Sequence, residues 1–161
     1  MTPSLRPATL LIALAVAAGA VVVHAEPIGA VDTAFQWIGP DHKIVVDAYD
    51  DPKVSGITCY VSHAKTGGVK GALGLAVDKS EASIACRQVG PVAVKQPLPQ
   101  QEEVFSERMS LLFKRLRIVR MVDRTRNTLV YLTYSDRLID GSPQNAVTAV
   151  AVDRGTAIPV K

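Results

Sequence analysis

The sequence predicts a mainly β fold, a single antiparallel barrel or sandwich domain with one or two short helices. Three observations support this prediction. About six short runs are rich in β-branched and aromatic residues, turn residues separate these runs, and no long unambiguous helical pattern occurs. The chain has no internal repeat and no low-complexity segment, which favours one domain with a single core. An α+β fold is the alternative.

The first segment after the N-terminal region, residues 28–39, is short and mixed. Phe35, Trp37 and Ile38 supply its apolar anchors, and a turn follows at residues 39–42. Trp37 is the only tryptophan of the chain. A large aromatic ring lies in a core more often than it serves as a platform for a ligand, so we expect Trp37 to be buried.

A hairpin is predicted next. Residues 43–49, KIVVDAY, are rich in β-branched residues and end at an Asp-Asp-Pro turn, because proline cannot continue a paired strand and aspartate favours turns. Residues 55–62 form the following strand, and the short connection makes the pair antiparallel. A third strand carries the second cysteine and stops at residues 90–91, Gly-Pro. Residues 91–101 contain three prolines and are expected to form an extended connection.

The C-terminal half predicts a second hairpin. Residues 102–116 fit a helical spacing and an alternating strand, and we favour the strand. Residues 116–122 alternate clearly, residues 123–127 resemble a turn, and residues 129–134, LVYLTY, form the partner strand. Residues 146–152, AVTAVAV, form the last predicted strand.

Residues 1–25 have the three parts of a cleavable secretory signal peptide. Arg6 precedes an uninterrupted apolar run over residues 8–23, and Val-His-Ala provides a cleavage site after Ala25. The run is shorter than the roughly 18–20 residues that span a bilayer, although an uncleaved membrane anchor is the alternative. We therefore expect an exported periplasmic protein, not integral to the membrane after cleavage, with residues 26–161 as one domain.

The charge of the expected mature chain is nearly balanced. Removal of Arg6 leaves 17 of the 18 basic residues against 15 acidic residues, a net charge of +2. So small an excess does not indicate nucleic-acid binding, and export argues against it.

The two cysteines, Cys59 and Cys86, lie in short apolar runs on either side of a glycine-rich stretch. Cysteines of an exported chain are usually paired, so we expect a structural disulfide. Free buried thiols are one alternative. A redox pair is another, but redox cysteines usually form a C-x-x-C motif near the start of a helix.

Several unusual strings occur along the chain in a defined order. They are DTAFQWIGPDHKIVVDAYDDP, ITCYVSHAKTGGVKGALGLA, ASIACRQVGP, LLFKRLRIVRMVD, LVYLTYSD and GSPQNAV. In these strings the sequence resembles the CreA family of bacterial envelope proteins, from about Glu26 to Val150. The resemblance implies a small exported protein without an established biochemical activity, and it supplies no catalytic residue.

Two groups of residues are candidates for binding. The glycine-rich loop could hold an anion through backbone amides and neighbouring lysines, namely Lys65, Gly67, Gly68 and Lys70. A basic run could form a partner surface, with Arg117, Arg120, Arg124 and Arg126 as its main residues. Arg117 and Arg120 have opposite parity in a strand, so we expect one of them to be partly buried or paired with an acid. A plain structural loop and a solvated sheet face are the alternatives.

No arrangement of residues predicts a catalytic site, a metal site or a cofactor. We therefore expect a non-enzymatic periplasmic binding module for an envelope protein or an anionic ligand. A small envelope enzyme with an unrecognised site and a structural accessory protein are the alternatives.

Overall fold

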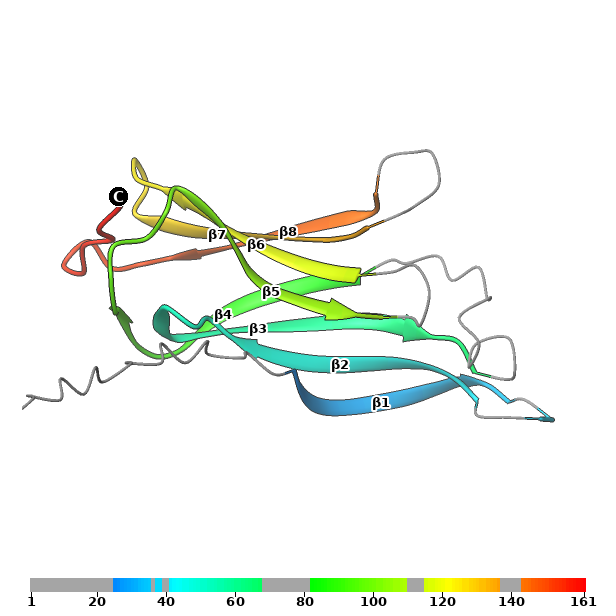
Figure 1. Ribbon diagram of the computed structural model, residues 1–161. Helices are drawn as coiled ribbons and strands as arrows, with labels where there is room; N and C mark the ends of the chain where they lie inside the picture. The colour runs from blue at the N-terminus through cyan, green and yellow to red at the C-terminus, as the bar shows by residue number, and fades with distance from the viewer. Residues whose placement is uncertain (1–24, 36, 39–40, 68–81, 110–114, 137–142) are drawn as a thin grey trace, which may run out of the picture.

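The computed structural model describes residues 25–35, 37–38, 41–67, 82–109, 115–136 and 143–161, which form two stacked β-sheets (Figure 1). The eight described strands are β1 (Glu26–Ala34), β2 (His42–Asp50), β3 (Val54–Lys65), β4 (Ala82–Val94), β5 (Gln101–Arg108), β6 (Arg115–Asp123), β7 (Thr128–Ser135) and β8 (Asn145–Ala151). One sheet has the order β1-β2-β3-β4 and the other β5-β6-β7-β8, with every neighbouring pair antiparallel. Each sheet is thus a meander of consecutive strands.

The core lies between the sheets, because alternate residues of the central strands point inward. In β3 the buried positions include Ile57, Cys59 and Val61, and in β6 they include Leu116 and Ile118. Cys59 lies directly opposite Cys86 of β4 and is joined to it by a disulfide. The expected Cys59–Cys86 bond therefore ties two neighbouring strands on the inner face of the first sheet.

The sheets face each other along most of their width. Tyr49 of β2 packs against Phe105 of β5, with ring centroids 4.0 Å apart. On the other side, the Cys86 N–H of β4 donates to Thr148 Oγ1 of β8 at 3.3 Å. Strand β1 lies outside this overlap at the margin of the first sheet (Figure 1), and all nine of its residues are exposed.

The two ends of the sandwich carry different segments of the chain (Figure 1). The turn end carries the β2–β3 turn (residues 51–53), the β6–β7 turn (residues 124–127) and the C-terminus. The opposite end of the first sheet, here called the tip end, carries the described residues of the β1–β2 connection, 35, 37–38 and 41.

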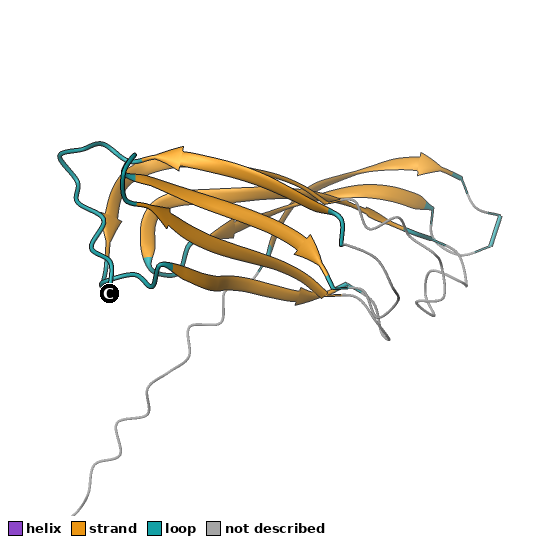
Figure 2. Cartoon of the chain, turned by 90° about the horizontal axis from the view of Figure 1, so that it is seen from above, coloured by secondary structure: helices purple, strands orange, loops and turns teal. Residues whose placement is uncertain are grey.

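The mainly β fold is confirmed as two antiparallel sheets, and the described residues contain no helix (Figure 2), so the expected short helices are not found there. The predicted strands over residues 43–49, 55–62, 116–122, 129–134 and 146–152 are observed as β2, β3, β6, β7 and β8, within one to three residues. The segment 102–116, for which a strand was favoured over a helix, begins within strand β5, and positions 110 to 114 lie outside the described residues.

Two details of the prediction are wrong. Strand β1 was not expected, because its residues are all exposed and leave no alternating pattern. Strand β4 does not stop at Gly90 but continues to Val94. The reason is a bulge in the pairing of β3 with β4, where the register shifts opposite Gly56. Gly56 has a φ of 79°, a conformation that favours glycine. Pro91 lies in the bulge, where the ladder requires no backbone N–H, so the strand can continue past it.

Candidate partner-binding surface

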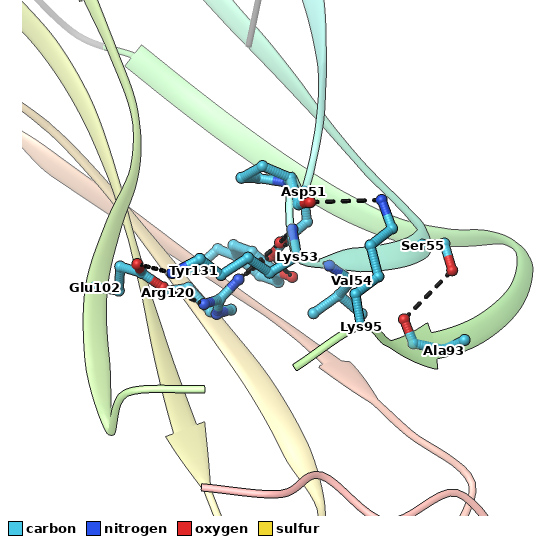
Figure 3. Close-up of polar contacts among 10 residues, drawn as sticks. Asp51, Lys53, Val54, Ser55, Ala93, Lys95, Glu102, Arg120 and Tyr131 are labelled. Carbon is cyan, nitrogen blue, oxygen red and sulfur yellow. Dashed lines mark hydrogen bonds and ion pairs between the residues drawn. The ribbon is translucent and has the colours of Figure 1, made fainter. Parts of the chain in front are cut away.

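A buried ion pair connects the two sheets at the turn end. Arg120 occupies an inward position of β6, and its side chain is 0% exposed. Its guanidinium donates to both carboxylate oxygens of Asp51, each at 2.7 Å, and to Glu102 Oε2 at 2.6 Å. Tyr131 Oη also donates to Asp51, at 2.9 Å (Figure 3). Arg120 is therefore the buried and acid-paired member expected of Arg117 and Arg120, and its place in the interior removes it from the candidate partner surface.

The β2–β3 turn is shaped around the same carboxylate. Asp51 Oδ1 accepts the backbone N–H groups of Lys53 and Val54 at 2.8 and 3.0 Å. The Lys53 ammonium group pairs with Glu102 of β5. Burial raises the pKa of Tyr131, and the charge of Asp51 raises it further, so the phenol stays protonated and donates to that carboxylate. These contacts satisfy the buried charge of Asp51 and fix the turn to the second sheet.

The other arginines of the basic run are exposed to different extents. Arg117 lies on the opposite face of β6 from Arg120 and donates to Glu103 Oε2 at 2.5 Å and to Asp136 Oδ2 at 2.8 Å. The hydrogen bond to Glu103, followed in size by the one to Asp136, raises the pKa of Arg117 above its usual value.

In the β6–β7 turn, Arg126 Nη1 donates to Asp123 Oδ2 at 2.8 Å. That hydrogen bond raises the pKa of Arg126 and lowers the pKa of Asp123. Arg124 is exposed beside it. The turn therefore presents one partly neutralised guanidinium and its neighbour, a weaker cationic surface than the sequence suggested.

The candidate anion loop is only partly described. The Gly67 N–H donates to His42 Nδ1 at 3.0 Å, and Gly67 is buried. This amide is therefore already bonded within the chain and does not face an anion. Lys65 is exposed, while Gly68 and Lys70 lie outside the described residues.

Two further polar contacts lie on the inner faces of the sheets. His63 Nε2 is 3.1 Å from Asp47 Oδ2, and Tyr49 Oη donates to Glu107 Oε2 across the two sheets at 3.0 Å. Burial raises the pKa of Tyr49, and the charge of Glu107 raises it further. Within the part of the chain that the structure describes, no group of three or more His, Cys, Asp or Glu residues is placed to hold a metal ion.

Exposed apolar side chains gather on β1, β2 and the connection between them. Eight large hydrophobic residues of the described chain are exposed, and six of them lie on β1, on β2 or between them: Ile28, Val31, Phe35, Trp37, Ile38 and Ile44. Phe35, Trp37 and Ile38, here called the apolar tip, are 75%, 94% and 76% exposed. The rings of Phe35 and Trp37 meet edge to face, with centroids 6.4 Å apart.

The prediction that Trp37 lies in the core is wrong. Trp37 follows Ala34, the last residue of β1, and β1 itself lies outside the overlap of the two sheets. The ring therefore meets no facing layer of side chains. Sequence reasoning missed this surface because it treated each aromatic residue singly. The available signal was the short spacing of Phe35, Trp37 and Ile38 directly before a Gly-Pro pair in the sequence.

Two pairs of like-charged residues face each other across neighbouring strands. Lys43 of β2 lies directly opposite Lys65 of β3, and Arg108 of β5 lies directly opposite Arg115 of β6. Like charges in directly opposed positions repel one another and destabilise a sheet. The lysine pair lies next to the β1–β2 connection, whereas the arginine pair lies at the end of the second sheet, beside Glu107, which bonds to Tyr49.

A family model described as "CreA protein" matches residues 28–155. The chain belongs to the CreA family. Three CreA relatives, each named "Protein CreA", come from Escherichia coli strains K12, CFT073 (O6:H1) and O157:H7. Each is 58% identical over 135 residues, which cover 81% of this chain and 86% of the relative. No solved structure matches the chain. The resemblance read from the sequence strings is thus confirmed.

A search for membrane-spanning helices among the described residues finds none of sufficient length and apolar character.

Proposed function

We propose that this member of the CreA family is exported to the periplasm and acts there as a non-enzymatic binding module that docks an envelope partner through its apolar tip. The observation that carries the proposal is the 94% exposure of Trp37, flanked by exposed Phe35 and Ile38. Exposed clusters of large apolar and aromatic side chains usually mark sites of association, because their burial against a partner is favourable.

The hydrogen bonds of the buried carboxylate Asp51 favour a binding role for the protein over a catalytic one. Asp51, the most buried carboxylate described, accepts hydrogen bonds from a guanidinium, a phenol and two backbone N–H groups. A carboxylate so fully bonded holds the fold together and has no lone pair directed at a substrate.

Export is supported by the N-terminal sequence and by the disulfide. Disulfides persist in oxidising compartments such as the periplasm, and Cys59 and Cys86 are bonded in the structure. Strand β1 begins at Glu26, so cleavage after Ala25 would leave every described strand whole.

The experiment places a photo-crosslinking amino acid at position 37 in living cells, with position 147 as the matched control. Val147 is also exposed, at 64%, but lies on β8 away from the tip. We expect the protein in the periplasmic fraction, beginning at Glu26, with strong crosslinks to envelope components from position 37 and few from position 147. Equal crosslinking at both positions, or a full-length cytoplasmic product, would overturn the proposal.

A further inference from the structure

We infer that the Cys59–Cys86 bond is made on the first sheet before the second sheet docks onto it. The chain is then a substrate of a thiol–disulfide oxidase that acts while the two sheets are still apart, and docking afterwards seals the bond against reductants. This inference concerns the assembly of the protein and does not depend on what the apolar tip binds. Three features support it: the register of the cysteines, their burial, and the strands that cover them.

The register of the first sheet brings the two thiols together without help from the second sheet. Cys59 of β3 lies directly opposite Cys86 of β4, and the pairing runs without interruption over residues 57–63 of β3. Directly opposed residues of an antiparallel pair have Cβ atoms roughly 4.5–5.5 Å apart, close to the separation that a disulfide requires. Pairing of β3 with β4 is therefore sufficient to place the thiols for oxidation.

In the folded protein neither cysteine can be reached by an enzyme. Cys59 is 3% exposed and Cys86 is 1% exposed, and both belong to the core between the sheets. Thiol–disulfide exchange proceeds by direct attack of a thiolate on a disulfide sulfur, so an oxidase or a reductant needs access to the cysteines. The closed sandwich excludes that approach.

The second sheet closes the row of the disulfide at both of its ends. Tyr49 of β2 lies directly opposite Cys59, and its ring packs against Phe105 of β5, with centroids 4.0 Å apart. At the other end of the row, the Cys86 N–H donates to Thr148 Oγ1 of β8 at 3.3 Å. Separation of the second sheet therefore uncovers the bond, while the ladder between β3 and β4 stays as it is.

The oxidation is a pair of exchange steps. The thiolate of one cysteine attacks the disulfide of the oxidase, which forms a mixed disulfide and releases one thiolate of the enzyme. The thiolate of the other cysteine then attacks the sulfur of the chain in the mixed disulfide, which completes the Cys59–Cys86 bond and releases the second thiolate of the enzyme. The chain loses two electrons and two protons, and the enzyme takes up both as a dithiol.

The first test measures reduction of the purified native protein by dithiothreitol, with alkylation and mass spectrometry to count the free thiols. We expect reduction at least about a thousandfold slower than in denaturant, because only the small open fraction of the protein reacts. Comparable rates in the native and the denatured protein would show that the bond is accessible and would refute the seal.

Matched tyrosine variants identify the motion that exposes the bond. Tyr131→Phe removes the hydrogen bond from β7 to Asp51 in the β2–β3 turn, so it weakens the contact between the sheets. This variant should be reduced at least about fivefold faster. Tyr134→Phe is the control on the outer face of the same strand, and it should be reduced at the unchanged rate.

A third variant distinguishes separation of the sheets from separation of β3 and β4. Gly56→Ala places a Cβ against the backbone of Gly90 in the bulge between these two strands. If Gly56→Ala accelerates reduction and Tyr131→Phe does not, the bond is exposed within the first sheet and the inference fails.

The second test follows oxidation of the reduced chain by a purified thiol–disulfide oxidase. The oxidase is added at the start of refolding in one sample and after refolding, followed by near-ultraviolet circular dichroism, in the other. We expect oxidation at least about tenfold slower in the second sample, because the docked sheets must first open. A reduced chain that cannot refold without the oxidase would also place the bond before docking. Equal rates in a chain that has already refolded would contradict this order.

Discussion

At the turn end of the sandwich charged side chains are buried, whereas at the tip end apolar side chains are exposed. Arg120 and Asp51 bond to each other in the interior with side chains that are 0% exposed. Trp37, at the opposite end, is 94% exposed. Both placements reverse the usual distribution of residues.

The two reversals have different energetic consequences. A buried ion is tolerable only while its partners remain, so the turn end should be sensitive to any change in its network. An exposed apolar side chain contributes little to folding, so the tip should be replaceable without loss of structure. The comparison predicts that stability depends on one end and association on the other.

The largest effect on stability should come from Arg120→Ala. This change leaves the Asp51 carboxylate buried without its cation and should lower the free energy of unfolding by about 3–5 kcal/mol. Chemical unfolding followed by circular dichroism measures the loss. Arg117→Ala is the control on the outer face of β6, and it should have a much smaller effect. A similar loss in both variants would end the distinction between buried and exposed arginines.

Removal of the disulfide should have the next largest effect. Cys59 and Cys86 are separated by 27 positions, and closure of such a loop stabilises a fold by roughly 3–4 kcal/mol in the chain-entropy model. Cys59→Ser with Cys86→Ser should therefore lower the melting temperature by roughly 10 °C. An unchanged melting temperature would show that the bond has another role. The bond lies in the middle of β3, so its loss should weaken both ends alike.

Gly56→Ala should lower stability by at least about 2 kcal/mol, because a residue with a side chain is strained in the left-handed region. A Cβ at this position would also lie only 2.7 Å from the Gly90 backbone oxygen. Gly29→Ala is the matched control in β1, since a Cβ there meets nothing within 4 Å. The melting temperatures of the two variants should differ clearly. Equal values would mean that the bulge at the turn end can relax.

The smallest effect on stability should come from the tip. Phe35→Ser with Trp37→Ser removes two exposed rings and should change the free energy of unfolding by no more than about 0.5 kcal/mol per residue. Denaturant titration followed by circular dichroism gives this value. A large loss would mean that the rings support the β1–β2 hairpin, and the tip could no longer be assigned to association alone.

The sequence allowed the strands with an alternating pattern to be predicted, because burial on one face leaves a period of two in the residues. The pairing of Cys59 with Cys86 was predicted from the expectation that the chain is exported. Strand β1 could not be predicted, since neither of its faces is buried. Parity placed Arg117 and Arg120 on opposite faces, but only the packing of the sheets decides which face is inside. Trp37 was misplaced because a single residue type cannot report the absence of a facing layer.

The connectivity of the two meanders has a consequence for folding kinetics. Within each sheet every strand pairs with its neighbour in sequence, so loop-closure entropy is small and the pairings can form early. The Arg120–Asp51 pair instead joins residues 69 positions apart and forms only when the sheets meet. We therefore expect docking of two preformed meanders to be the late step, in which Arg120→Ala accelerates unfolding and leaves the folding rate nearly unchanged.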